Sequence, residues 1–303
     1  MRLGIFDSNS SSGGSIDDLV ASARLAHEHG FASWWLPQIF GFEALAVLGI
    51  VGREVPEIAL GTAVVPTYPR HPVTMAAEAL TAQAASGGRL TLGIGLSHRM
   101  VIEDMFGVSF DKPARHMREY LAALMPLLAG QNAATTGETI SVSAELTLPE
   151  GIVAPDVVVA ALGPKMLELA GREAQGTVTW MTGPRTLASH IVPSVSTAAA
   201  AADRPAPRIV ACLPVCVTHD IDAARARAAK GFEIYGFLPS YRAMLDREGA
   251  EGPADVAIVG NEVEVASAIS ALADVGVTEF VAVEYSTREP ERSRTRDLLR
   301  SLR

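Results

Sequence analysis

The chain has 303 residues, of which 49% are hydrophobic and 19% are charged, and its formal net charge is -9 at pH 7. This apolar content is typical of a globular protein with a large core. The negative charge argues against nucleic acid or an anionic membrane as the main partner. An anionic cofactor remains compatible with it, because helix N-termini and a few local donors can hold a phosphate in an acidic protein.

The two cysteines, Cys212 and Cys216, lie in a segment with the pattern of a β-strand. In a strand their Cα atoms would be roughly 13 Å apart, which is too far for an unstrained disulfide. The first residues do not form a signal peptide, and no apolar run approaches the roughly 18 residues of a membrane span. We therefore expect a cytoplasmic protein with no membrane segment.

Short β-branched runs alternate with longer helical patterns along the chain, as in a parallel sheet covered by helices. The predicted strands are 2–6, 33–36, 58–65, 89–95, 157–161, 177–181, 208–217 and 279–284. The predicted helices are 15–30, 42–53, 72–87, 113–129, 164–173, 184–202, 221–235, 262–273 and one that starts at 290. Alternation in 139–148 predicts a small hairpin within an insertion near 131–155. This order predicts an α/β fold, a (β/α)₈ TIM barrel with insertions, as one domain over 1–303.

In such a barrel the residues that follow the strands gather at one rim, where the chemistry takes place. Two of these turns join strand to helix through Gly-Pro, at Gly163-Pro164-Lys165 and at Gly183-Pro184-Arg185. Proline suits the first helical position, and free N–H groups at a helix start favour an anion. The pair predicts a phosphate site, with ordinary helix starts as the alternative. Barrel phosphate sites usually follow strands seven and eight, whereas these follow strands five and six.

Several motifs together are more specific than any one turn. They are SWWLPQ at 33–38, LGTAVVP at 60–66, RHP at 70–72 and GGRLTLGIG at 87–95. This series resembles the luciferase-like monooxygenase superfamily, with the bacterial luciferase-like barrel. It is most similar to the actinobacterial branch that uses the deazaflavin coenzyme F420. The resemblance covers almost the whole chain and implies an F420-dependent oxidoreductase, a homodimer, with a non-prolyl cis peptide at Ala63-Val64.

The resemblance also implies where the cofactor is held. The implied contacts are Thr62, Ala63 and Val64 behind the ring, Gly95, Leu96, Ser97 and His98 beside it, Gly163, Pro164, Lys165 and Met166 at the phosphate, and Thr182 and Gly183 at the ribityl chain. The reaction it implies passes a hydride between the deazaflavin ring and a small organic substrate.

One position departs from the family pattern. Many F420-dependent members have Asp-His after strand two, where the histidine acts on a substrate proton, but this chain has Pro37-Gln38. Glutamine has no usable proton near neutral pH. The candidates for the catalytic site are therefore His98, whose pKa suits proton transfer, and Gln38 as the residue at the altered position. A rim histidine satisfied by water or backbone is the alternative for His98.

Substrate contacts are predicted at Gln38 and at Tyr235 and Tyr241, which flank an irregular stretch suited to a pocket wall. Two alternatives to the F420 enzyme stay open. One is an FMN-dependent monooxygenase that uses reduced flavin and oxygen. The other is a non-catalytic flavin- or F420-binding protein, which Gln38 makes plausible. No His, Cys, Asp or Glu spacing suggests a metal site.

Overall fold

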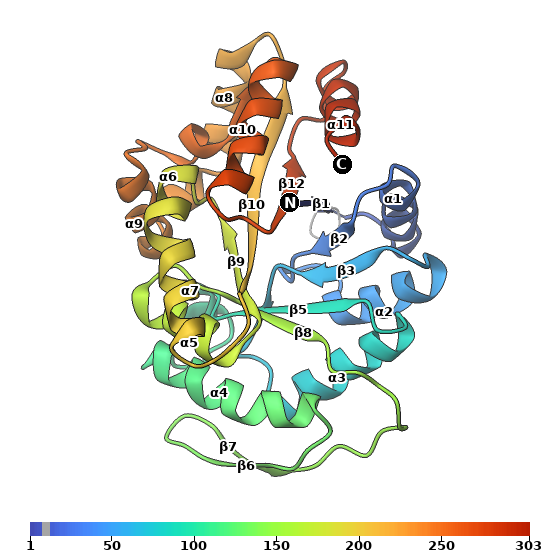
Figure 1. Cartoon of the computed structure of the whole chain (residues 1–303), viewed down its shortest axis with the longest axis vertical. Helices are drawn as coiled ribbons and strands as arrows, with labels where there is room; N and C mark the ends of the chain where they lie inside the picture. The colour runs from blue at the N-terminus through green and yellow to red at the C-terminus, as the bar shows by residue number, and fades with distance from the viewer. Residues whose placement is uncertain (8–12) are drawn as a thin grey trace.

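The computed structural model of the chain describes residues 1–7 and 13–303. Within these residues, eight parallel strands close into a ring and helices cover its outside (Figure 1). In spatial order the ring strands are β1 (Arg2–Phe6), β2 (Ser33–Leu36), β3 (Ala59–Thr62), β5 (Leu90–Gly95), β8 (Asp156–Ala160), β9 (Gly176–Trp180), β10 (Arg208–Val217) and β12 (Glu279–Glu284). Pairing of β12 with β1, which puts Leu3 opposite Phe280, closes the ring. The predicted TIM barrel is thereby confirmed.

The helices that cover the barrel start and end where local signals place them. They are α1 (Ile16–Glu28), α2 (Ala44–Glu54), α3 (Pro72–Ala85), α4 (Pro113–Leu128), α5 (Pro164–Glu173), α6 (Pro184–Thr186), α7 (Val192–Ala200), α8 (Ile221–Gly231), α9 (Pro239–Glu248), α10 (Glu262–Asp274) and α11 (Glu291–Ser301). Helix α1, for example, begins with a capping box of Ser15 and Asp18 and buries Leu19 and Ala23 against the barrel. None of the helices in the described ranges is long and apolar enough to cross a membrane.

A polar network fills the end of the barrel where the strands begin. Glu279 is 1% exposed and accepts hydrogen bonds from Arg208 at 3.0 Å, from the Trp35 indole at 3.1 Å and from Ser33. Arg208 also pairs with Asp156 at 2.8 Å. Because the buried carboxylate is matched by a cation and by neutral donors, the network is compatible with burial. This end of the barrel is thereby filled with side chains, and the other end is left to bind ligands.

The third predicted strand is interrupted. Strand β3 stops at Thr62, and a two-residue strand, β4 (Val65–Pro66), pairs again with β5. The peptide bond between Ala63 and Val64, which lies at the break, is cis, and this confirms the expectation from the family resemblance. The pattern of 58–65 predicts a continuous strand because its β-branched and apolar residues do not register the break.

Two long predicted helices are also divided. The helix predicted over 184–202 consists of α6, a π-helical turn (Leu187–Ile191) and α7. The helix predicted over 221–235 ends at Gly231, and a 3₁₀ turn (Glu233–Gly236) leads to α9, which was not predicted. Gly231, Gly236 and Pro239 explain the breaks in the second of these helices, because glycine weakens a helix and proline starts a new one.

The predicted hairpin in the insertion exists, but its strands are displaced. Strand β6 (Ala133–Thr136) pairs antiparallel with β7 (Ser141–Ala144), so only the first part of 139–148 is in the hairpin. It lies outside the barrel, beyond α4 (Figure 1). A further short strand, β11 (Ile258–Gly260), extends the sheet beside the end of β10. Neither change alters the ring.

Candidate active site

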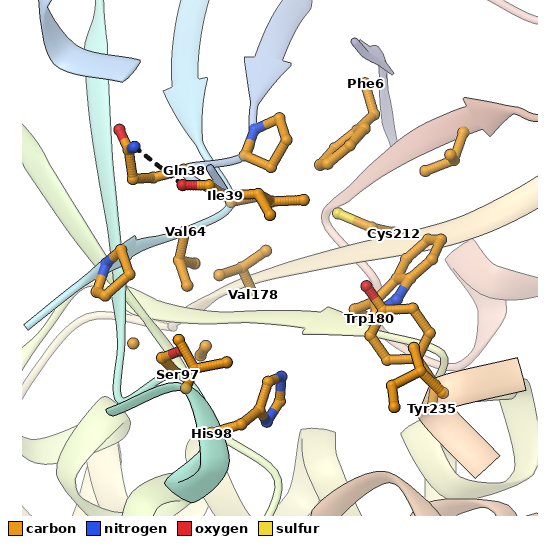
Figure 2. A pocket seen from close by; sticks show the side chains of 18 of the residues that line it. Phe6, Gln38, Ile39, Val64, Ser97, His98, Val178, Trp180, Cys212 and Tyr235 are labelled. Atoms are coloured by element: carbon orange, nitrogen blue, oxygen red, sulfur yellow. Dashed lines mark hydrogen bonds between the residues drawn. The ribbon is translucent and has the colours of Figure 1, made fainter. Parts of the chain in front are cut away.

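A cavity of about 2560 Å³ lies at the end of the barrel where the strands finish. Its lining includes residues at or just after the ends of β1, β2, β5, β8, β9 and β12, and the interruption after β3. Figure 2 shows Val64, Gln38, Ser97, His98, Trp180 and Tyr235 around this common space. The predicted rim of the barrel is therefore a real cavity, and its walls differ in chemistry.

The first wall is backbone-rich and comes from β3 and β5. Ala63 and Val64 line the cavity, and the Ala63 N–H donates to Leu36 O at 2.8 Å. A Cβ on Gly93 would lie 1.8 Å from Thr62 O, and one on Gly95 would lie 2.7 Å from Val64 Cγ2. Only glycine at these two positions lets the interruption at Ala63-Val64 lie against β5.

Thr62 supports this wall from behind. Its side chain is fully buried, accepts from Gly93 N at 2.8 Å and donates to Gly93 O at 2.8 Å. It is not among the residues that line the cavity. The structure therefore gives Thr62 a supporting position, and direct contact with a ring stays a prediction.

The turn after β5 brings four predicted residues to the cavity, Gly95, Leu96, Ser97 and His98. Ser97 has a left-handed backbone with φ 62°, and the His98 carbonyl accepts from the N–H groups of Val101 and Ile102, both at 2.9 Å. These bonds fix the start of a π-helical turn (Val101–Met105). Burial lowers the pKa of the His98 imidazole below its usual value of 6.5, so the neutral ring dominates near neutral pH.

Gln38 lines the cavity, but its side-chain amide is engaged with the protein. Its Oε1 accepts from Ala44 N at 2.6 Å, at the start of α2, and its Nε2 donates to Ile39 O at 3.3 Å (Figure 2). Glu43 caps the same helix through Leu45 N and Ala46 N. Gln38 is therefore a fixed part of the wall, and its roles in catalysis and substrate contact stay predictions.

The opposite wall is aromatic. The Trp180 ring is 6.4 Å from that of Phe6, 5.6 Å from that of Phe232 and 5.7 Å from that of Tyr235, centroid to centroid. Tyr235 and Tyr241 are 5.0 Å apart, in an edge-to-face arrangement that aromatic pairs favour. Burial raises the pKa of both phenols, so they stay protonated near neutral pH.

His98 connects this aromatic wall to the turn after β5, since its ring centroid is 5.8 Å from that of Tyr241. The two tyrosines predicted to contact substrate, Tyr235 and Tyr241, are thus neighbours of His98, the predicted proton-handling residue. Sequence reasoning missed Phe6, Trp180 and Phe232, which line the same cavity. Phe6 and Trp180 are the last residues of β1 and β9, and that position is the signal that could have identified them.

The two Gly-Pro turns prove to be different. Gly163 and Met166 line the cavity, and a Cβ on Gly163 would meet nothing within 4 Å. Pro164 and Lys165 are exposed and lie outside the lining. The start of α5 thus has open space in front of it, as an anion site requires.

At the second turn, the carboxylate of Glu248 accepts from Arg185 N at 3.1 Å and from Thr186 N at 2.7 Å. The prediction that this turn offers free N–H groups to an anion is wrong, because Glu248, 62 residues further along the chain from Thr186, already occupies them. Thr182 is buried and donates to Trp180 O at 3.2 Å. Thr182 and Gly183 do not line the cavity, and their contact with a ribityl chain stays a prediction.

We expect Glu248→Ala to lower the free energy of unfolding by about 1 kcal/mol, the usual contribution of a helix-capping side chain. Urea denaturation followed by circular dichroism measures this change. The matched control is Glu251→Ala, since the Glu251 side chain is exposed and close in sequence. Equal stability of the two variants would contradict a capping role for Glu248.

No three His, Cys, Asp or Glu side chains in the part of the chain that the structure describes lie together as a metal site would require.

A family model described as luciferase-like monooxygenase matches residues 1–279. The chain therefore belongs to the luciferase-like monooxygenase family and is an oxidoreductase of that family.

Similar proteins include enzymes that use F420. A 5,10-methylenetetrahydromethanopterin reductase of Methanolobus tindarius is 26% identical over 290 residues, covering 86% of this chain and 88% of the relative. A putative coenzyme F420-dependent oxidoreductase of Mycobacterium tuberculosis is 30% identical over 183 residues, covering 55% and 51%. The F420-dependent tetrahydromethanopterin reductase of Methanopyrus kandleri has the same fold, with a TM-score of 0.80 at 20% identity, covering 99% of this chain and 97% of that one.

Proposed function

We propose that this chain is an F420-dependent oxidoreductase that passes a hydride between the deazaflavin ring and a small organic substrate. The observation that carries the proposal is the wall formed by Ala63, Val64 and Gly95, which presents backbone and one valine to the cavity. The relative at 30% identity, which is described as a putative coenzyme F420-dependent oxidoreductase, supports the choice of cofactor.

The residues present are compatible with a flat ring that carries a phosphate-bearing side chain. Ala63 and Val64 would lie behind the ring, and Gly95, Leu96 and Ser97 beside it. Gly163 and Met166 would receive the phosphate at the start of α5, with Pro164 and Lys165 next to the turn. Thr62 would hold the wall in place through Gly93. When bound, F420 supplies the hydride exchange, and the protein supplies position and environment.

The aromatic wall determines the environment in which the substrate reacts. Trp180, Tyr235 and Tyr241 close one side of the cavity with rings, which keep water away from the reacting atoms. His98 is half-buried beside Tyr241 and is the side chain placed to hold or give a proton. Gln38 is a neutral part of the wall at the position where the family resemblance implies a histidine in many F420-dependent members.

Titration with F420 and with FMN tests this proposal. We expect F420 to bind at micromolar concentration with a change in its fluorescence, and FMN not to bind in the same range. Tight binding of FMN alone would contradict the proposal and favour a flavin-dependent monooxygenase. The fold alone is compatible with that alternative as well. The oxygenating constituent of 3,6-diketocamphane monooxygenase of Pseudomonas putida, in complex with FMN, has the same fold, with a TM-score of 0.76 at 17% identity, covering 99% of this chain and 96% of that one.

Binding of F420 would leave open whether the chain is a catalyst or a carrier. A panel of enones, imines and alcohols, assayed by the absorbance of oxidised F420, separates these two. Binding of F420 without turnover of any member would favour the non-catalytic binding protein.

A further inference from the structure

Exposed apolar side chains gather around the mouth of the cavity. They come from three segments, after β2, after β5 and between α8 and α9, and are Ile39, Phe40, Met100, Phe106, Ile234 and Phe237. Phe237 is 74% exposed and Phe40 is 60% exposed, although both are large aromatic residues. A cluster of exposed apolar side chains at a cavity mouth marks a binding surface, because water contact makes it costly unless a ligand covers it.

The apolar character continues from the mouth to the floor. Phe6, Val178, Trp180, Cys212 and Val283 line the inner part, and Figure 2 shows the first four of them together beyond Ile39 and Val64. Val178, Cys212 and Val283 belong to one buried apolar cluster inside the barrel. A ligand that enters past Ile39 therefore meets apolar atoms along its whole path.

Most of the charged side chains along this path have partners. In five arginine–carboxylate pairs among the described residues at least one member lines the cavity, and they are Arg70–Glu43, Arg70–Glu78, Arg99–Glu103, Arg227–Glu291 and Arg296–Glu284. Arg292 and Asp104 also line it, and both are exposed.

Most of the inner wall is apolar, and the acidic side chain of Asp7, 4% exposed, lines it as well and accepts a hydrogen bond from Ser22. Burial lowers the pKa of His98 and raises that of Tyr241 and of Cys212, so all three are uncharged near neutral pH. An anionic group brought to the floor would lose its water without gaining a cationic partner there.

We propose that the substrate is an elongated apolar molecule without a negative charge. Its reacting end would lie between Val64 and Trp180, and its tail would leave the cavity against Phe40 and Phe237. This substrate class rests on the proposed function, since it names the molecule that the F420 enzyme would reduce or oxidise. A second copy of the chain seated on the same exposed residues is the competing occupant, and the test includes it.

The test measures binding to the protein without turnover, by displacement of the uncharged dye Nile red. The competitors are butan-2-one, octan-2-one, dodecan-2-one and 2-oxododecanoate, which carries a carboxylate beside the ketone on a chain of the same length. We expect affinity to rise about threefold per added methylene among the neutral ketones, since each buried methylene favours binding. We expect 2-oxododecanoate to bind at least about tenfold more weakly than dodecan-2-one, because its carboxylate would lie on the floor.

The double variant Phe40→Ser, Phe237→Ser tests the place of the tail. We expect it to weaken the binding of dodecan-2-one by about tenfold and to leave the binding of butan-2-one unchanged, because only the long chain reaches the mouth. The matched control is Val153→Ser, Val263→Ser, which removes two exposed apolar side chains, 72% and 79% exposed, that do not line the cavity.

The outcomes are distinct. Equal affinities for the three neutral ketones, or tighter binding of the carboxylate, would overturn the proposed substrate class. A double variant that dissociates in sedimentation analysis while ketone binding is unchanged would also overturn it, in favour of a second copy as the occupant. Chain-length dependence in a protein that shows no F420 binding would overturn the proposed function and leave a binding protein for apolar ligands.

Discussion

Gly95→Val is expected to weaken F420 binding by at least about 100-fold while the barrel stays folded. A Cβ at this position would lie 2.7 Å from Val64 Cγ2 and 3.1 Å from Ala160 Cβ, so the added side chain has no room. The neighbouring Val64 faces the cavity and would be displaced into the space that the ring needs (Figure 2). Fluorescence titration with F420 measures the loss, and far-UV circular dichroism checks the fold.

Two further variants define the cause of this effect. Gly252→Val is the matched control, since a Cβ there meets nothing within 4 Å and its φ is -156°, which any residue adopts. In the double variant Gly95→Ala, Val64→Ala, the Val64 methyl groups are gone and only the 3.1 Å approach to Ala160 Cβ is left, so binding is expected to return to within about tenfold of the original chain. Unchanged F420 affinity in Gly95→Val would show that the ring does not lie on this wall.

His98→Ala is expected to lower kcat by about 100-fold, the usual contribution of a positioned general acid or base. The ring is half-buried beside Tyr241 at the cavity wall, and its backbone carbonyl is fixed by Val101 and Ile102. Steady-state rates with saturating F420 measure the change. His27→Ala is the matched control, because that imidazole lies on α1 and approaches Glu57, away from the cavity lining.

The pH dependence gives a second measurement on the same side chain. Burial lowers the pKa of His98 below 6.5. As the pH rises, the ring therefore loses its proton before pH 6.5 is reached. In the direction that reduces substrate, kcat is expected to fall as the pH rises through this lowered pKa. This fall in kcat is expected to be absent in His98→Ala. A profile that is the same in both proteins would remove His98 from the proton transfer.

Most of the barrel could be predicted from periodicity because its strands and helices obey local rules. Ser15 and Pro164 start helices as N-cap and first-turn residues, and the strand ranges agree with the structure within one or two residues except around the interruption after Thr62. The cis bond after Ala63 came from the family resemblance, since no local rule predicts it for a non-proline residue.

The parts that were missed depend on contacts between distant residues. Glu248 fills the start of α6 from a helix that the sequence pattern did not reveal, so the turn at Gly183 looks the same as the one at Gly163. The aromatic wall joins Phe6, Trp180 and Phe232, whose proximity only the closed ring produces. Gln38 has the spacing of a site residue, while its amide takes part in starting α2.

The Glu248 carboxylate binds the start of α6 through backbone N–H groups only. The C-terminal end of α9 is therefore fixed by bonds that do not involve the side chains of its first turn, where Tyr241 faces the cavity. Meanwhile the wall of Val64 and Gly95 comes from a separate stretch of the chain. The bonds that join Glu248 to α6 therefore place no restriction on cavity side chains such as Tyr235 and Tyr241.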